Sequence, residues 1–336
     1  MRSLLATDHC PLRCPPGSYN RSVAMIQSLS LGRVPYDEAL KIQEELVALR
    51  LAGRIENTLL LLEHPPVLTL GRNASRANIL ASEALLTSRG VTVHEINRGG
   101  DVTFHGPGQL IGYPIFDLRS LANPNGGRLG PVDFVRLLEE ALIRLCAVYG
   151  VHATRIPGLT GVWCPADGKP LDQSSGSGTE ERSRPQAKIG AIGIHVSRGV
   201  TSHGFAFNVT TDLDFFRLIN PCGITDRPVT SLAREVPDPA SIPSLESIAH
   251  QAARQFGLVF HEEILALASL DDLRAEATTS PSAELRLAAP QLTPLQVEEP
   301  QGLRGSESIG TPLQIPPEVE RLLDPHFDPR TRPARA

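Results

Sequence analysis

One cysteine and one lysine have the residue types that acyl transfer requires. Cys222 lies in the short motif NPCG at 220–223, and Lys188 begins the motif KIGAIG 34 positions earlier. A cysteine can carry an acyl group as a thioester, and a lysine can gain and lose a proton near neutrality if its pKa is lowered. The pair therefore indicates acyl transfer, with Cys222 as the nucleophile and Lys188 as the proton carrier.

A structural alternative is open for both residues. Free cysteines are among the most buried residues and usually act as small hydrophobic side chains. Pro221 and Gly223, however, favour a tight, irregular backbone in which the Cys222 side chain faces a cleft. Lys188 is one of only three lysines among 32 basic residues, and an arginine in its place could not lose a proton. These features favour the catalytic interpretation.

A glycine-rich motif, RGGDVTFHGPGQ at 98–109, is the second candidate for ligand binding. Adjacent glycines let a backbone adopt positive φ and approach a ligand, so Gly99 and Gly100 could present N–H groups to a carbonyl or a phosphate. The alternative is an ordinary hairpin turn with a charged edge. The role of His105 also has two interpretations, because a histidine before Gly-Pro-Gly can either cap a turn or act in catalysis.

The segments that must position these residues mix helical and strand periodicity. Apolar residues recur at spacings of 3, 4 and 3 in 35–51 and again in 131–149, as in amphipathic helices. Strands and helices do not alternate strictly, so the pattern predicts an α/β (α+β) fold with a mixed β-sheet core and packed helices. We expect helices at 35–51, 82–88, 131–149 and 244–256, and strands at 58–63, 67–70, 91–96, 161–164, 189–196 and 204–209.

The same pattern divides the chain into a catalytic domain and two flanking segments. The domain is expected at 25–265, with an inserted loop at 166–186 that is rich in Ser and Gly and lacks apolar periodicity. The segment 1–24 is expected to be a disordered or misassigned extension, since its apolar patch is too short for a signal peptide. The segment 266–336, rich in Pro and Glu, is expected to be a disordered tail with a short helix around 318–323.

Composition excludes several functional classes. The 336 residues, 41% of them hydrophobic, can bury a sizeable core. The longest apolar run, 59–70, is interrupted by charged residues and prolines and falls short of the roughly 20 residues that cross a membrane. The net charge of −5 lies mostly after residue 264, so bulk charge argues against nucleic-acid binding.

The cysteine pattern bears on compartment and on metal binding. Five cysteines, an odd number in a long chain, favour reduced thiols. We therefore expect a cytoplasmic protein, or a mitochondrial-matrix protein if the source is eukaryotic. Cys10 and Cys14 have no second pair at zinc spacing, so no metal site is expected.

Five motifs together resemble the lipoyl(octanoyl) transferase family in content, order and approximate spacing. The resemblance extends over about 36–260 and implies an α/β fold similar to the catalytic domains of lipoate and biotin protein ligases. It also implies an acyltransferase that moves an octanoyl group from acyl carrier protein to a lysine of a lipoyl carrier domain, the first step of endogenous protein lipoylation. The motifs are EHPPVLTLGR at 63–72, RGGDVTFHGPGQ at 98–109, KIGAIG at 188–193, HGFAFNV at 203–209 and NPCG at 220–223.

The resemblance implies roles for individual residues and partners. Cys222 matches the acyl-thioester cysteine of the family, and Lys188 matches its partner lysine. The implied partners are octanoyl-acyl carrier protein and the lipoyl domains of 2-oxoacid dehydrogenase complexes and of glycine cleavage H protein. No cofactor is implied beyond the phosphopantetheine of the donor. The implied substrate-contacting residues are Arg98, Gly99, Gly100, Asp101, Val102, Thr103, Phe104, His105, Ala191, Ile192, Gly193, Gly204, Phe205 and Ala206.

The inserted loop and the tail depart from the family pattern, and two other functional classes stay open. If the loop projects from the tip of a hairpin, the strand of Lys188 stays in register. A thiol hydrolase could use His105 or His203 as the base for Cys222, with water as the acyl acceptor. A non-catalytic module could bind acyl carrier protein or lipoyl domains. Synthesis of an acyl adenylate, as in the ligases, would require ATP.

Overall fold

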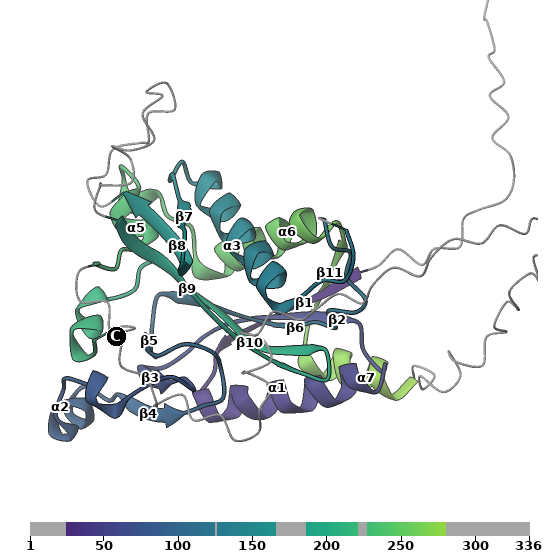
Figure 1. The fold of residues 1–336 in the computed structure, drawn as a ribbon, viewed down its shortest axis with the longest axis horizontal. Helices are drawn as coiled ribbons and strands as arrows, with labels where there is room; N and C mark the ends of the chain where they lie inside the picture. The colour runs from purple at the N-terminus through teal and green to yellow at the C-terminus, as the bar shows by residue number, and fades with distance from the viewer. Residues whose placement is uncertain (1–24, 125, 166–185, 221–226, 280–336) are drawn as a thin grey trace, which may run out of the picture. The chain divides into compact units, whose positions relative to one another are not determined.

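Eight strands form the central sheet of the computed structural model, which describes residues 25–124, 126–165, 186–220 and 227–279 (Figure 1). Their order is β11-β1-β2-β6-β10-β9-β8-β7. Strand β1 runs parallel to β2 and β11, and the other neighbouring pairs are antiparallel. The strands are β1 (Met25–Arg33), β2 (Asn57–Glu63), β6 (Gln109–Ile115), β7 (Thr154–Ile156), β8 (Leu159–Pro165), β9 (Gln186–Ser197), β10 (Val200–Asn208) and β11 (Glu263–Leu267).

A smaller sheet of three strands carries the glycine-rich motif. Its order is β4-β3-β5, with β3 between a parallel and an antiparallel partner. Side chains of this sheet pack with two short helices, α2 and η2, in a hydrophobic cluster of their own. The bounds are β3 (Val67–Leu70), β4 (Thr92–Glu95), β5 (Val102–His105), α2 (Glu83–Ser88) and the 3-10 helix η2 (Leu213–Leu218).

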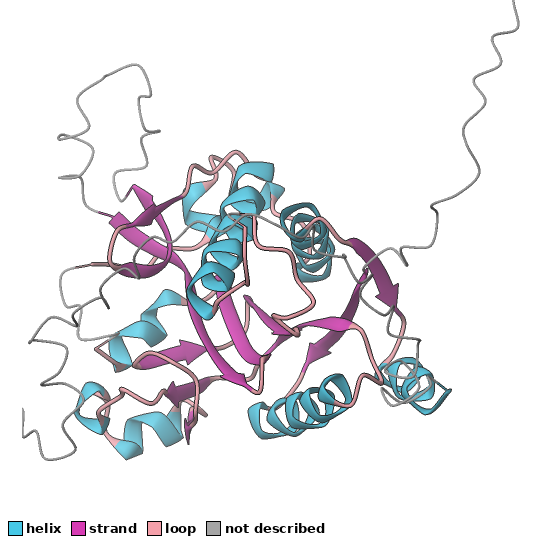
Figure 2. Cartoon of the chain, turned by 45° about the vertical axis from the view of Figure 1, so that its right-hand side comes forward, coloured by secondary structure: helices cyan, strands magenta, loops and turns pink. Residues whose placement is uncertain are grey.

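Longer helices cover both faces of the central sheet (Figure 2). Helices α1 and α7 pack on one face, and α3 and α6 pack on the other. Ala39, Ile42 and Leu46 are buried along one side of α1, as their helical spacing predicts. Within the described part of the chain, no helix is long and apolar enough to cross a bilayer. The bounds are α1 (Tyr36–Leu51), α3 (Pro131–Val148), α5 (Leu232–Glu235), α6 (Leu245–Phe260) and α7 (Leu270–Thr279), with 3-10 helices η1 (Arg76–Asn78) and η4 (Pro239–Ser241).

The mixed sheet with packed helices confirms the predicted fold class, and the helices and strands expected between residues 35 and 256 are present with shifted ends. The sequence pattern does not predict β1, β5, β6, β7 or β11. Strand β6 is not recognisable from the sequence because it contains Gly112 and Pro114, and both residue types are disfavoured inside strands. The ring of Phe205 occupies the space that a Cβ of Gly112 would fill, so close packing against β10 explains the glycine.

The strand that carries Lys188 is paired in register on both sides of the predicted insertion. Strand β8 ends where Pro165 pairs with Gln186 at the start of β9, so the intervening segment connects two adjacent antiparallel strands. Residues 166–185 of the predicted loop lie outside the described residues, and Gln186 belongs to β9. The register of Lys188 is therefore set by its pairing with Trp163 in β8.

Folded structure continues beyond the predicted end of the domain at residue 265, so this part of the expectation is wrong. Leu273 is fully buried and Ala277 nearly so, and both belong to the hydrophobic cluster that includes α1. Arg274 forms an ion pair with Glu45 of α1 at 2.8 Å. Residues four positions apart lie on the same face of a helix, so α7 turns one apolar face toward this cluster. The segment 1–24 lies outside the described residues, as does the part of the predicted tail from 280 to 336 with its expected helix around 318–323, and the expectations for both stay predictions.

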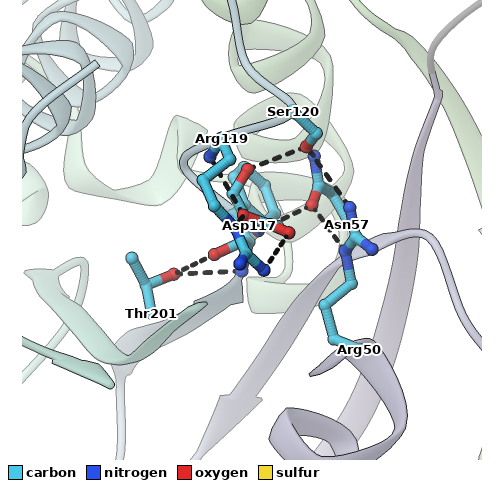
Figure 3. Close-up of polar contacts among 7 residues, drawn as sticks. Arg50, Asn57, Asp117, Arg119, Ser120 and Thr201 are labelled. Carbon is cyan, nitrogen blue, oxygen red and sulfur yellow. Dashed lines mark hydrogen bonds and ion pairs between the residues drawn. The ribbon is translucent and has the colours of Figure 1, made fainter. Parts of the chain in front are cut away.

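A network of polar contacts joins α1, β2, β6 and β10 at one end of the central sheet (Figure 3). Asn57 Oδ1 accepts hydrogen bonds from the backbone N–H of Asp117 (2.9 Å) and from Nε of Arg50 (3.0 Å). Thr201 Oγ1 donates to Pro114 O (2.6 Å) in β6. These contacts fix the start of β10 against β6, and therefore the register of the cavity-lining residues farther along β10.

Replacing Leu273 with alanine tests whether α7 belongs to the folded core. Because the side chain is fully buried, we expect Leu273→Ala to lower the free energy of unfolding by about 2–5 kcal/mol. The control is Leu80→Ala, whose side chain is exposed and whose replacement should change stability by less than about 0.5 kcal/mol. Urea unfolding followed by circular dichroism measures both. Equal stability of the two variants would contradict the placement of α7.

Candidate active site

A cavity of about 240 Å³ lies between the central sheet and the small sheet. Lys188 lines it, together with all of the predicted substrate-contacting residues except Gly99 and Phe104. Phe104 is buried instead, because its ring stacks on Phe215 at 4.7 Å between centroids in the cluster beside the small sheet. The structure therefore brings together three motifs that are far apart in the sequence.

Two of these motifs face each other across neighbouring strands. In the β9–β10 pair, Ala191 lies opposite Ala206 and Gly193 lies opposite Gly204. A Cβ on Gly193 would approach Gly99 O to 2.7 Å, and a Cβ on Gly204 would overlap Gly112 O. Glycine is therefore required at both positions for the backbones to approach. The result is a floor of small residues beneath the cavity.

The glycine-rich loop is attached to this floor by its own backbone. The N–H of Gly99 donates to Ile194 O of β9 at 2.9 Å, so it is not presented to a ligand as the sequence suggests. The guanidinium of Arg98 is buried and donates from Nη2 to Thr69 O (2.8 Å) and Thr69 Oγ1 (3.0 Å). Asp101 accepts from Asn78 Nδ2 at 2.7 Å. Arg98 thus places a positive charge at the cavity wall and braces the loop against β3.

Buried polar side chains connect the small sheet to the strand of Lys188. The amide nitrogen of Gln109 donates to Asn208 Oδ1 (2.8 Å) and to a backbone carbonyl, so its oxygen accepts from Nδ1–H of His105 (2.9 Å). Asn208 Nδ2 in turn donates to Thr230 O (2.9 Å), and Thr230 N–H donates to Lys188 O (2.9 Å). This chain of hydrogen bonds fixes the relative positions of His105 and Lys188.

The two histidines of the cavity wall are weak bases. Burial lowers the pKa of His105 well below its usual value, and the nearby His64 and Arg98 lower it further. Its Nε2 is hydrogen-bonded to Thr69 Oγ1 at 3.2 Å. Burial, with the charge of Arg98, also lowers the pKa of His203 to about 4. A neutral histidine with so low a pKa is a poor proton acceptor at neutral pH, which disfavours the thiol hydrolase alternative.

Lys188 contacts an aromatic ring and the segment that follows the cysteine motif. Its Nζ lies 4.6 Å from the ring centroid of Trp163. Its backbone N–H donates to Pro228 O at 2.9 Å. Cys222 lies in 221–226, outside the described residues. On the other side of that gap, Asn220 N–H donates to Asn78 O at 2.7 Å, and Asn78 is bonded to Asp101 of the cavity wall. Both described flanks of the cysteine motif are thus attached to residues of the site.

Several polar residues of the site are not singled out by sequence reasoning. Gln109 begins β6 and Asn208 ends β10, and each is almost fully buried. Tyr113 donates from its hydroxyl to Nε2 of His64 at 2.7 Å, since Nδ1–H of His64 donates to Val34 O. A polar residue inside an apolar strand is the sequence signal that these residues share. Their partners come from distant segments, so the signal alone does not assign a role.

Comparisons with known proteins assign the family. The family model described as Lipoyl protein ligase A/B catalytic domain matches residues 35–256. An archaeal bipartite lipoate protein ligase from Thermoplasma acidophilum has the same fold, with a TM-score of 0.54 at 16% identity over 76% of this chain and 91% of that chain. A lipoate-protein ligase A solved with bound ATP has a TM-score of 0.53 at 14% identity over 75% of this chain and 92% of that chain. The chain belongs to the lipoyl protein ligase A/B catalytic-domain family.

Relatives at more than 50% identity over most of their own length are octanoyltransferases. An octanoyltransferase of Acidobacterium capsulatum is 56% identical over 76% of this chain and 98% of its own length. An octanoyltransferase of Koribacter versatilis is 53% identical over 74% of this chain and 90% of its own length. These relatives confirm the predicted resemblance to the octanoyltransferases, and the chain is an acyltransferase of that kind.

The buried histidines make the stability of the fold depend on pH. His64 and His203 have pKa values lowered by burial to about 4, and that of His105 is also well below its usual value. In the unfolded chain a histidine titrates near pH 6.5. Acid therefore favours the unfolded state, and stability is complete above about pH 6.5 and falls as the pH drops toward 4.

We expect the free energy of unfolding to be nearly constant above pH 7 and to fall by roughly 1 kcal/mol or more per pH unit between pH 6 and 5. Urea unfolding at a series of pH values measures it. His64→Gln removes one of the histidines that take up a proton on unfolding, so it should reduce the dependence of stability on pH by the contribution of one proton. The variant His152→Gln, at an exposed position, serves as the control. A wild-type stability that does not change between pH 7.5 and 5 would show that these histidines are not held neutral.

Proposed function

We propose that this protein transfers an octanoyl group from acyl carrier protein to a lysine of a lipoyl carrier domain, through a thioester on Cys222. The main support is the cavity lined by Lys188 and by the small residues of β9 and β10, in a chain 56% identical to an octanoyltransferase. An apolar slot above small side chains suits an unbranched acyl chain.

In the first step the thiolate of Cys222 attacks the carbonyl carbon of the octanoyl thioester. The bond from that carbon to the phosphopantetheine sulfur breaks, and the ammonium of Lys188 gives its proton to the departing thiolate. The products are the octanoyl thioester of Cys222, the free thiol of the carrier and a neutral Lys188 amine. A cation beside a cysteine also favours its thiolate form.

In the second step the amine of the lipoyl-domain lysine attacks the octanoyl-Cys222 carbonyl. Lys188 removes a proton from the attacking amine, the bond to the Cys222 sulfur breaks, and an amide forms. Because an amide is much more stable than a thioester, the transfer needs neither ATP nor another cofactor. This distinguishes the proposal from an adenylate-forming ligase reaction, in which omission of ATP would abolish the product.

The acceptors in this proposal are the lipoyl domains of 2-oxoacid dehydrogenase complexes and glycine cleavage H protein, and the compartment is the cytoplasm. The fold similarity to a ligase that was described together with its E2 lipoyl domain supports an acceptor of this class. The weak basicity of His105 and His203 supports transfer to an amine over hydrolysis by water.

Replacing Cys222 tests the nucleophile. Cys222→Ser should form no thioester adduct when incubated with octanoyl-acyl carrier protein, and intact-protein mass spectrometry detects the adduct. The matched control is Cys146→Ala, because Cys146 is fully buried and burial raises the pKa of its thiol well above the usual value. An octanoyl adduct on Cys222→Ser that an apo lipoyl domain still discharges would overturn the assignment.

Replacing Lys188 separates its two roles. Lys188→Arg keeps the positive charge but can neither give up nor accept a proton. A thiolate can leave without being protonated, whereas an attacking amine must lose a proton to form the amide. Discharge to the lipoyl domain should therefore fall by about 100-fold or more while acylation falls by less than about tenfold. Quenched-flow mass spectrometry follows both steps, with Lys41→Arg at an exposed position of α1 as the control. Equal losses in the two steps would contradict the proton cycle.

A further inference from the structure

We propose that Trp163 is a positioning residue that holds the ammonium of Lys188 on its indole face and aims it at the cavity. The proposal rests on the function proposed above and adds a residue to which no role has been assigned. Trp163 lies in β8, directly opposite Lys188 in the β8–β9 pair. Side chains at opposite positions of an antiparallel pair leave the sheet on the same face and contact each other.

The contact has the geometry of a cation–π interaction. Lys188 Nζ lies 4.6 Å from the ring centroid of Trp163, within the distance of about 6 Å at which a cation is attracted to an aromatic face. Trp163 is only 1% exposed, so water does not screen the side of the ring that the ammonium contacts. Among aromatic side chains, tryptophan presents the most attractive face to a cation.

The indole N–H of Trp163 favours this interpretation over simple packing. Trp163 Nε1 is buried and has no hydrogen-bond partner among the described residues. A buried donor without a partner destabilises a fold, and buried tryptophans usually have one. A phenylalanine or leucine would fill a hydrophobic position without that cost. What tryptophan adds at this position is the face that contacts Lys188.

A second set of contacts supports the stem of Lys188. A Cβ on Gly161 would lie 2.7 Å from Gly190 O, so the close approach of β8 to β9 requires glycine there, and the Lys188 stem lies alongside this position, with Cε 3.4 Å from that Cβ. Gly161 has φ +124°, a conformation that other residues rarely adopt. Its N–H donates to Oε1 of Glu139 at 3.0 Å, and Glu139 is fully buried and paired with Arg136 and Arg155. The Lys188 side chain thus passes beside Gly161 and ends at the Trp163 ring.

The guanidinium of Arg227 also contacts the Trp163 ring. Its guanidinium carbon lies 5.7 Å from the Trp163 centroid, and its neighbour Pro228 accepts the Lys188 N–H. Arginine keeps its charge through the cycle. When Lys188 gives its proton to the departing thiolate, Arg227 still occupies the ring, and repulsion between the two cations is relieved. The ring therefore holds both the lysine strand and the described residues that follow the cysteine motif.

The test uses the fact that the chain contains one tryptophan. Biosynthetic replacement by fluorinated tryptophans changes only position 163, and fluorine weakens the attraction of the ring for a cation while preserving its shape. Octanoyl adduct formation from octanoyl-acyl carrier protein is measured by quenched-flow mass spectrometry, and the melting temperature is measured in parallel. We expect the rate to fall stepwise with the number of fluorines at an almost unchanged melting temperature.

Two substitutions and a control complete the experiment. Trp163→Leu should lower the rate of adduct formation by about tenfold, and Trp163→Phe should recover part of it. The control, Phe134→Leu, removes a fully buried core aromatic that packs on Phe116 and Phe260, and it should lower stability without changing the rate. Equal rates for unlabelled and fluorinated enzyme, or for Trp163→Leu and Trp163→Phe, would contradict the role of Trp163 and leave the proposed function standing. If the wild type forms no adduct, the proposed function fails and the role of Trp163 fails with it.

Discussion

The close approach of the β9–β10 pair to the glycine-rich loop is the constraint on which the site depends. Gly193 and Gly204 have no side chain because backbone oxygens of Gly99 and Gly112 occupy the space a Cβ would need. The N–H of Gly99 is then close enough to donate to Ile194 O, which attaches the small sheet to the central one. A larger residue at Gly193 would push the glycine-rich loop away from β9, and one at Gly204 would separate β10 from β6 within the central sheet.

The polar interior follows from this approach. Bringing two sheets together buries polar groups that must find partners, and the series His105, Gln109 and Asn208 supplies them. The series ends at Thr230, whose N–H donates to the carbonyl of Lys188. The residues that satisfy buried polar groups are thus also those that set the position of the proposed proton carrier. Their burial keeps the histidine neutral, so Lys188 is the basic group suited to the transfer.

Much of this site was predictable from the sequence, because its motifs are local. The strings around Arg98, Lys188 and His203 identify the family and the walls of the cavity. The side-chain directions within them were not predictable: Phe104 belongs to the cavity motif, yet it packs on Phe215 in the cluster beside the small sheet. The contact of Trp163 with Lys188 depends on the register of β8 and β9, which includes an irregularity between Val162 and Trp163. Such a register is set by long-range pairing rather than by the local pattern.

In the proposed mechanism a single sulfur carries the acyl group between two proteins. Peptide mapping of the wild-type enzyme after incubation with octanoyl-acyl carrier protein, with and without an apo lipoyl domain, tests it directly. We expect one octanoylated peptide, which contains Cys222, and we expect it to disappear when the lipoyl domain becomes octanoylated on lysine. Octanoyl found on another residue, or an adduct that persists while the lipoyl domain is modified, would contradict it.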